Sequence, residues 1–184
     1  MQWKTVVTTL LLTLSLSACE SMARPATIGA GASVVNIMSN ATIVHASFNG
    51  QGMGGGGGEE CCVSLPKKWQ PGMMATIEWT KDPSPDTNPG GIKPPRYNPD
   101  GTTTPEVIKW HAIHKANYTH HSITMQVPPY QKVSSLVLIF LPCDKVYPLI
   151  DSAEHSRVLG HLPYGEGRAK EIIRRLGASP TCQP

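Results

Sequence analysis

The sequence lacks the motifs and the charge that mark several common functional classes. No Gly-x-Ser-x-Gly or His-Glu-x-x-His segment occurs in the 184 residues, so neither a hydrolase nucleophile elbow nor a metalloprotease zinc motif is present. The formal net charge is only +3 and the basic residues are scattered, which argues against a nucleic-acid-binding surface. No apolar run reaches the ~20 residues that a membrane-spanning helix needs.

Residues 1–18 have the organisation of a secretory signal peptide. Lys4 provides a positive start, residues 6–16 are mostly apolar, and small residues precede Cys19. A cysteine after such residues forms a lipobox, which in bacteria implies acylation of Cys19 and cleavage before it. Several acyl chains would anchor the protein stably to a membrane. Because Glu20 is not the aspartate that favours inner-membrane retention in enteric bacteria, we expect the outer membrane, facing the periplasm.

The remaining chain is long enough for one domain. We expect a lipidated tether over residues 19–31 and a single β-rich periplasmic domain over residues 32–184. Short apolar segments separated by turn residues predict a mostly β fold, a small antiparallel sandwich or open barrel with one short C-terminal helix. The expected strands are residues 33–38, 42–48, 60–65, 73–80, 106–118, 122–127 and 135–141.

Three of these assignments make specific claims about the fold. Residues 33–38 and 42–48 are expected to form one antiparallel hairpin. The most apolar run, residues 135–141, is expected to be a central buried strand. The helix is expected at residues 167–176, where Gly177 would stop it.

Five cysteines are present, of which Cys19 is assigned to lipidation. The other four are disulfide candidates in an oxidising compartment. We expect Cys143 to pair with Cys61 or Cys62, and Cys182 to take the other bridge unless one thiol stays free. A bridge between Cys61 and Cys62 is discounted because it closes an eight-membered ring. Metal binding is also discounted, because no nearby histidine has zinc-site spacing.

Two loops are candidates for binding a partner. A run of five glycines can be a flexible loop or a site of close backbone approach, and residues 83–105 hold seven prolines, which excludes a central strand. Long loops in small domains are often functional or mobile. The candidate partner-binding residues are Gly54, Gly55, Gly56, Gly57, Gly58, Pro94, Pro95, Arg96 and Tyr97.

The histidines do not form an obvious site in the sequence. His111, His114, His120 and His121 lie close together, but on the expected strand His111 and His114 would point to opposite faces. On a helix they would share a face. We expect surface histidines around a loop, no catalytic group, no cofactor and no metal.

One block of the sequence resembles a family of bacterial lipoproteins that is catalogued as a domain of unknown function. Residues 54–72 contain the glycine run and the signature Cys-Cys-Val-x-Leu-Pro-x-Lys-Trp-x-Pro-Gly, and the Ile-Glu-Trp of residues 77–79 follows. Residues 127–130 and 140–144 resemble later blocks of the family, so the similarity covers about residues 33–147. The opening strand departs from the family pattern, because residues 35–40 keep only its asparagine.

This resemblance implies a function that composition alone does not. Members of the family are often encoded beside type VI secretion lipases, and several act as their immunity proteins. The resemblance therefore implies a non-enzymatic inhibitor that binds a secreted phospholipase effector in the periplasm and protects the producing cell. Two other hypotheses stay open: a structural or assembly lipoprotein of the envelope without a toxin partner, and a thiol enzyme that uses Cys61 or Cys62.

Overall fold

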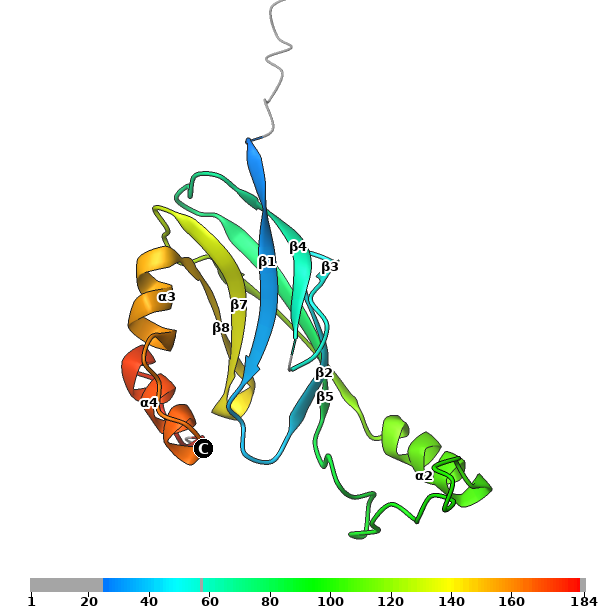
Figure 1. Ribbon diagram of the computed structural model, residues 1–184. Helices are drawn as coiled ribbons and strands as arrows, with labels where there is room; N and C mark the ends of the chain where they lie inside the picture. Colours follow the sequence, from blue (N-terminus) through cyan, green and yellow to red (C-terminus); the bar gives the residue numbers. More distant parts are fainter. Residues whose placement is uncertain (1–24, 57, 183–184) are drawn as a thin grey trace, which may run out of the picture.

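The computed structural model describes residues 25–56 and 58–182, which fold into two four-stranded sheets packed face to face (Figure 1). The expected signal peptide and the lipidation residue Cys19 lie outside the described residues. The two sheets are not closed into a barrel, and the helices are few and short. The predicted fold class, a mostly β sandwich, is therefore confirmed.

The first sheet is mixed and has the strand order β4-β1-β7-β8. Strand β1 runs antiparallel to β4 and parallel to β7, and β7 runs antiparallel to β8. Its strands are β1 (Thr27–Asn36), β4 (Glu59–Pro66), β7 (Val133–Leu141) and β8 (Lys145–Asp151). Strand β1 thus begins within residues 19–31, the segment that we expected to be a tether.

The second sheet is antiparallel and has the strand order β3-β2-β5-β6. Its strands are β2 (Thr42–Phe48), β3 (Gln51–Gly52), β5 (Met74–Asp82) and β6 (Thr119–Gln126). The helices of the described region are α2 (Pro105–Ala116), the short 3₁₀ turn η2 (Pro142–Asp144), α3 (Ser152–Leu159) and α4 (Glu166–Leu176). The helix predicted at residues 167–176 is therefore confirmed as α4, and Gly177 adopts the left-handed conformation that ends it.

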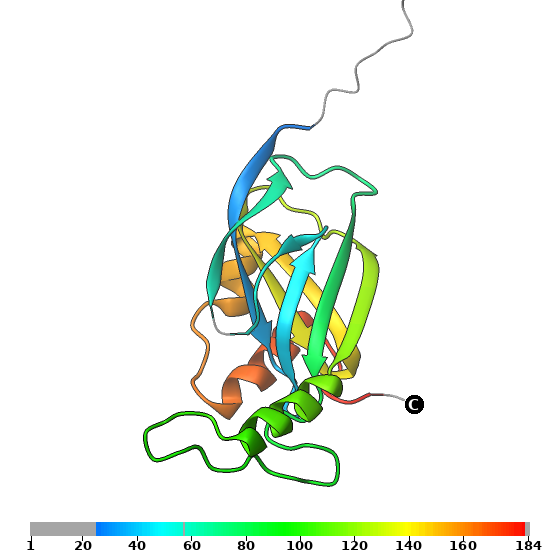
Figure 2. The ribbon, with the colours of Figure 1, turned by 90° about the vertical axis from the view of Figure 1, so that its right-hand side faces the viewer.

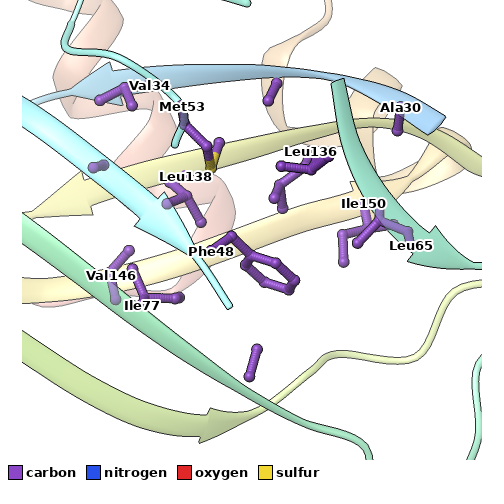
Figure 3. Packing of buried hydrophobic residues seen from close by; sticks show 14 of the residues in the cluster. Ala30, Val34, Phe48, Met53, Leu65, Ile77, Leu136, Leu138, Val146 and Ile150 are labelled. Carbon is purple, nitrogen blue, oxygen red and sulfur yellow. The ribbon is translucent and has the colours of Figure 1, made fainter. Parts of the chain in front are cut away.

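The main core lies between the two sheets and follows the period-two pattern of the strands (Figure 3). Ala75, Ile77 and Trp79 of β5 all point inward and are buried, as their alternation predicts. Phe48 of β2 packs in the same layer as Leu138 of β7. Burial of this continuous apolar layer is the main favourable contribution to folding.

Strand β7 is buried on both faces, which explains its uninterrupted apolar sequence. Leu138 faces the main core between the sheets. Ile139 faces the opposite way, into a second cluster where Val158 of α3 and Ile172 of α4 cover the first sheet (Figure 1). The expectation of a central buried strand at residues 135–141 is confirmed.

The expected hairpin of residues 33–38 and 42–48 is wrong. Strands β1 and β2 belong to different sheets, because β1 pairs with β7, where Val35 lies opposite Ile139. The chain crosses between the sheets after β1, and the Asn36 side chain fixes the crossing by donating to the Ala41 carbonyl (2.6 Å). A turn signal at residues 39–40 marks a change of direction but does not say which strand becomes the neighbour.

The expected strand at residues 106–118 is also wrong, because this segment forms helix α2. Its N-terminus has a regular cap: the Thr104 hydroxyl accepts a hydrogen bond from the Val107 backbone N–H, and Pro105 occupies the first turn. Val107, Trp110 and His114 are its buried residues, at a spacing that fits one helical face.

The cysteine pairing differs from the expectation. Cys61 is bridged to Cys62, and Cys143 to Cys182 with a Cα separation of 5.3 Å. Strand β1 lies between β4, which carries the first pair, and β7, after which Cys143 follows. Two strand spacings of about 4.8 Å separate the two sites, beyond the reach of a disulfide. Cys143 instead bonds the segment that follows α4.

The described helices give no membrane span: none is both long and apolar enough to cross a bilayer.

Candidate functional site

Residues 83–118 form an insert between two neighbouring strands. Strand β5 ends at Asp82 and β6 begins at Thr119, yet Lys81 and Thr119 are directly paired in the sheet. The connection could therefore be a short turn, but it carries a long loop and helix α2. Figures 1 and 2 show this insert projecting from one end of the sandwich, away from the end where β1 starts.

A buried polar network joins the insert to the sandwich. Asp82 at the end of β5, Asn88 in the loop and His114 in α2 are 5%, 4% and 5% exposed. The Nε2 atom of His114 lies 2.9 Å from Asp82 Oδ2, and its Nδ1 atom lies 3.0 Å from Asn88 Oδ1. Three segments that are separate in the sequence thus meet at one imidazole ring.

The hydrogen-bond partners fix the orientation of the Asn88 amide in this network. The Asn88 amide donates to the Trp110 carbonyl (3.0 Å), so its Oδ1 atom is the acceptor that faces His114. Both ring nitrogens of His114 therefore face oxygen atoms of buried side chains, so the imidazole ring joins Asp82 to Asn88. Burial, followed by the negative charge of Asp82, raises the pKa of the nearby Tyr118 phenol.

Aromatic side chains pack against the His114 ring of this network. The Trp110 ring stacks on His114 with 4.5 Å between ring centroids, and the Tyr118 ring meets His114 edge-on at 5.6 Å. The Trp110 indole N–H donates to the Ile92 carbonyl (3.0 Å), which ties the loop to α2. These contacts hold the loop and the helix as one unit.

The outer side of this unit carries an apolar groove of about 310 Å³. Ile92 and Ile113 line it and are 60% and 45% exposed. Its complete lining is Asn88, Pro89, Ile92, Pro95, Glu106, Lys109, Trp110 and Ile113. Ile108 on the same helix is also 60% exposed. Clustered exposed apolar side chains with a few charged neighbours are typical of interaction sites.

The partner-binding residues predicted in the proline-rich loop belong to this surface. Pro95 lines the groove. Tyr97 is half exposed, and its hydroxyl lies 3.2 Å from His111 Nε2, so it is held beside α2. Pro94 and Arg96 are exposed next to them. The structure therefore places these four residues on or beside one surface.

The glycine run occupies a different place. The backbone N–H of Gly56 donates to the Ile43 carbonyl, and the Gly54 carbonyl accepts from Ala46, so this part of the run lies along β2. A Cβ on Gly55 would come within 2.5 Å of the Val44 carbonyl oxygen. Glycine is thus required there by packing against a strand. Gly58 is exposed, and Gly57 lies outside the described residues.

Sequence reasoning missed the three residues that matter most for the insert. Asp82 and Asn88 were not singled out, and His114 was expected at the surface although it is buried. The cap at Thr104 and the spacing of Val107 and His114 could have indicated the helix. No local signal connects His114 with Asp82.

The described residues hold no group of three or more His, Cys, Asp or Glu side chains placed to bind a metal ion. The four cysteines of this region are all in disulfides.

Comparison with known proteins gives one match. Residues 35–147, more than half of the chain, match the family described as "Protein of unknown function (DUF3304)". The chain belongs to this family. The match confirms the resemblance to a family of unknown function that we inferred from the signature block. No curated protein and no solved structure matches the chain.

The DUF3304 match includes the insert and both strands that carry it. It ends at Tyr147, within β8, so α3, α4 and Cys182 lie beyond it. The groove is therefore part of the DUF3304 region, whereas α3 and α4, which cover the first sheet, lie outside it.

Proposed function

We propose that this DUF3304 protein is a lipid-anchored immunity protein that binds and inhibits a secreted phospholipase of the type VI class in the periplasm. The observation that carries the proposal is the projecting insert, whose exposed apolar groove is held in place by the buried Asp82–Asn88–His114 network. A surface that is organised before binding loses less conformational entropy when a partner docks.

The position of the insert supports a protein partner. Strand β1 starts at one end of the sandwich and α2 lies at the other (Figure 1). If Cys19 is acylated, the chain enters the domain from the membrane side, and the groove faces the aqueous periplasm. The insert is then placed to meet a soluble enzyme before that enzyme reaches the lipid.

The composition of the groove supports the same conclusion. Inhibitor interfaces usually have an apolar centre with a polar rim. Here Ile92, Trp110 and Ile113 provide the centre, and Glu106 and Lys109 lie at the rim. The groove alone is too small for a stable interface of roughly 1,200–2,000 Å², so the exposed loop around Tyr97 would contribute as well.

Co-expression tests the proposal. Cells that make a phospholipase encoded beside this protein's gene in the periplasm should lose viability, and the full chain should restore it. Ile92→Asp combined with Ile113→Asp should abolish the rescue, because it places charge in the apolar centre. Ile28→Asp, at a similarly exposed isoleucine on β1, is the matched control and should still rescue.

The envelope-structural alternative makes the opposite prediction. If the exported protein fails to rescue the cells and forms no complex with the phospholipase, the immunity proposal is wrong. A genomic neighbourhood without any phospholipase gene would favour the same alternative.

A further inference from the structure

Strand β6 leaves an unprotected edge on the second sheet. It is the last strand in the order β3-β2-β5-β6, so β5 pairs with it on one side only. The pairing runs through eight consecutive residues without a register shift. Residues 119–126 contain no proline, lysine, arginine or acidic residue, which are the usual features that keep an edge strand from pairing with another chain.

The register identifies which backbone groups face this edge. Val127 donates to the Met73 carbonyl (2.8 Å), so the odd-numbered residues of β6 bond to β5. The even-numbered residues therefore turn their N–H and C=O groups to the free edge; they are His120, Ser122, Thr124 and Gln126. Within the described part of the chain, no other segment bonds to these groups through its backbone.

The other edges of the two sheets are shorter, interrupted or covered. Strand β3 has only two residues. On β4, the Ser64 backbone N–H donates to the Gln51 side chain (2.7 Å). Strand β8 contains Pro148, and α3 contacts it. The open edge of β6 is therefore a local feature of this strand.

A polar hollow of about 490 Å³ lies beside this edge on the outer face of the sheet. Its lining includes the outward side chains of three strands: His45, Ser47, Glu78, Thr80, His120 and Ser122. Hydrogen bonds between Thr80 and His120 (3.0 Å) and between Thr76 and Thr124 (3.0 Å) show that the even-numbered residues of β5 and β6 share this face.

The chemistry of the hollow indicates what could lie over it. A strand added to β6 would send every second side chain onto this outer face. Glu78 supplies the one carboxylate among the lining residues, and it lies directly opposite Ser122 on the neighbouring strand. An added strand would run roughly 10 Å from the backbone of β5, a span that a long basic side chain and the Glu78 side chain can bridge together.

We propose that the free edge of β6 binds an extended segment of a partner protein, which adds a strand to the sheet and places a lysine or arginine side chain over Glu78. Backbone hydrogen bonds to residues 120–126 give the affinity, and the hollow gives the sequence preference. This surface is distinct from the groove of the insert, and the proposal does not require the partner to be a phospholipase.

A displayed library of heptapeptides tests this proposal. In each peptide, every second position is threonine or valine and the positions between them are randomised. The target is the full chain purified in mild detergent. Enriched peptides should carry lysine or arginine at the randomised positions. Ser122→Pro removes one free N–H without touching the β5 ladder and should weaken binding about tenfold or more, whereas Ser122→Thr keeps the N–H and should bind normally.

Glu78→Gln separates the two parts of the proposal. This variant should lose the preference for basic residues in the peptide and still bind an added strand. Glu60→Gln on the other sheet is the control and should change neither the preference nor the strand addition. Amide exchange provides a measurement that does not depend on the proline variant. Binding of an enriched peptide should slow exchange at His120, Ser122 and Thr124, which face the edge.

Three results would overturn the proposal. The first is a library that yields no enriched peptide. The second is an enriched peptide whose binding and amide-exchange footprint do not involve β6. The third is self-association of the full chain that Ser122→Pro abolishes, because a second copy would then be the occupant of the edge.

Discussion

Replacing His114 with alanine would remove the side chain that joins the insert to the end of β5. The substitution leaves the buried Asp82 Oδ2 and Asn88 Oδ1 atoms without the ring nitrogens that they face. Leaving a buried polar group without its hydrogen-bond partner costs about 1–3 kcal/mol for each of these two groups. Loss of the stacking contact with Trp110 adds about 0.5–1.5 kcal/mol.

We expect this cost to fall on the insert and not on the sandwich. Val107 and Trp110 are buried but belong to neither of the two core clusters, so the insert has a small core of its own. Elements with separate cores open as separate units. At about 1.4 kcal/mol per factor of ten, the two costs together should make the open insert more populated by roughly two to five powers of ten.

Amide hydrogen exchange followed by mass spectrometry measures this effect segment by segment. Protection should fall in peptides from residues 83–118 and persist in peptides from β7. His111→Ala lies on the same helix, where its ring contacts the exposed Tyr97 hydroxyl and meets the Trp110 ring nearly at a right angle; it is the matched control and should change little. Equal loss of protection in β7 would show that the insert is not a separate unit, and unchanged protection of residues 83–118 would show that the network does not hold it.

Three further predictions concern stability. Cys143→Ser should lower the free energy of unfolding by about 2–4 kcal/mol in chemical denaturation, because the bridge to Cys182 closes a long loop; an unchanged midpoint would contradict the pairing. Thr104→Ala should cost about 1 kcal/mol and increase exchange in the first turn of α2 only, whereas a loss spread over the sandwich would refute a local capping role. Hydrogen bonds from Arg174 and Arg175 lower the pKa of Glu171 from 4.5 to about 2. The stabilising contribution of Glu171 is therefore complete above pH 4.5 and is lost as the pH falls toward 2. Thermal unfolding of Glu171→Gln should lack this part of the acid dependence, and identical acid profiles of the variant and the original protein would contradict the prediction.

The parts of the fold that were predictable from the sequence are those with local patterns. Strand β5 alternates apolar and polar residues, β7 is a continuous apolar run, and α4 ends at a glycine that takes a left-handed conformation. Each pattern reports burial or backbone conformation within one element. Such signals do not depend on the rest of the chain.

The errors in strand order and in cysteine pairing came from non-local pairing, whereas the local signals for helix α2 were overlooked. Strand β1 lies between β4 and β7, and this order separates Cys61 and Cys62 from Cys143. Nothing within those segments encodes the neighbour of β1. The candidate site has the same property: Pro95 and Tyr97 were identifiable because proline-rich loops are exposed, but the contact between His114 and Asp82 exists only after β5, the loop and α2 have come together.

The central claim is that the groove of the insert binds and inhibits a phospholipase, and titration of enzyme activity tests it most directly. If the proposal holds, increasing amounts of the full chain should inhibit a purified phospholipase whose gene neighbours its own, at a one-to-one ratio. The variant carrying Ile92→Asp and Ile113→Asp should fail to inhibit, while Ile28→Asp inhibits normally. Unaltered phospholipase activity at a saturating concentration of the folded protein, or full inhibition by the double variant, would contradict the account.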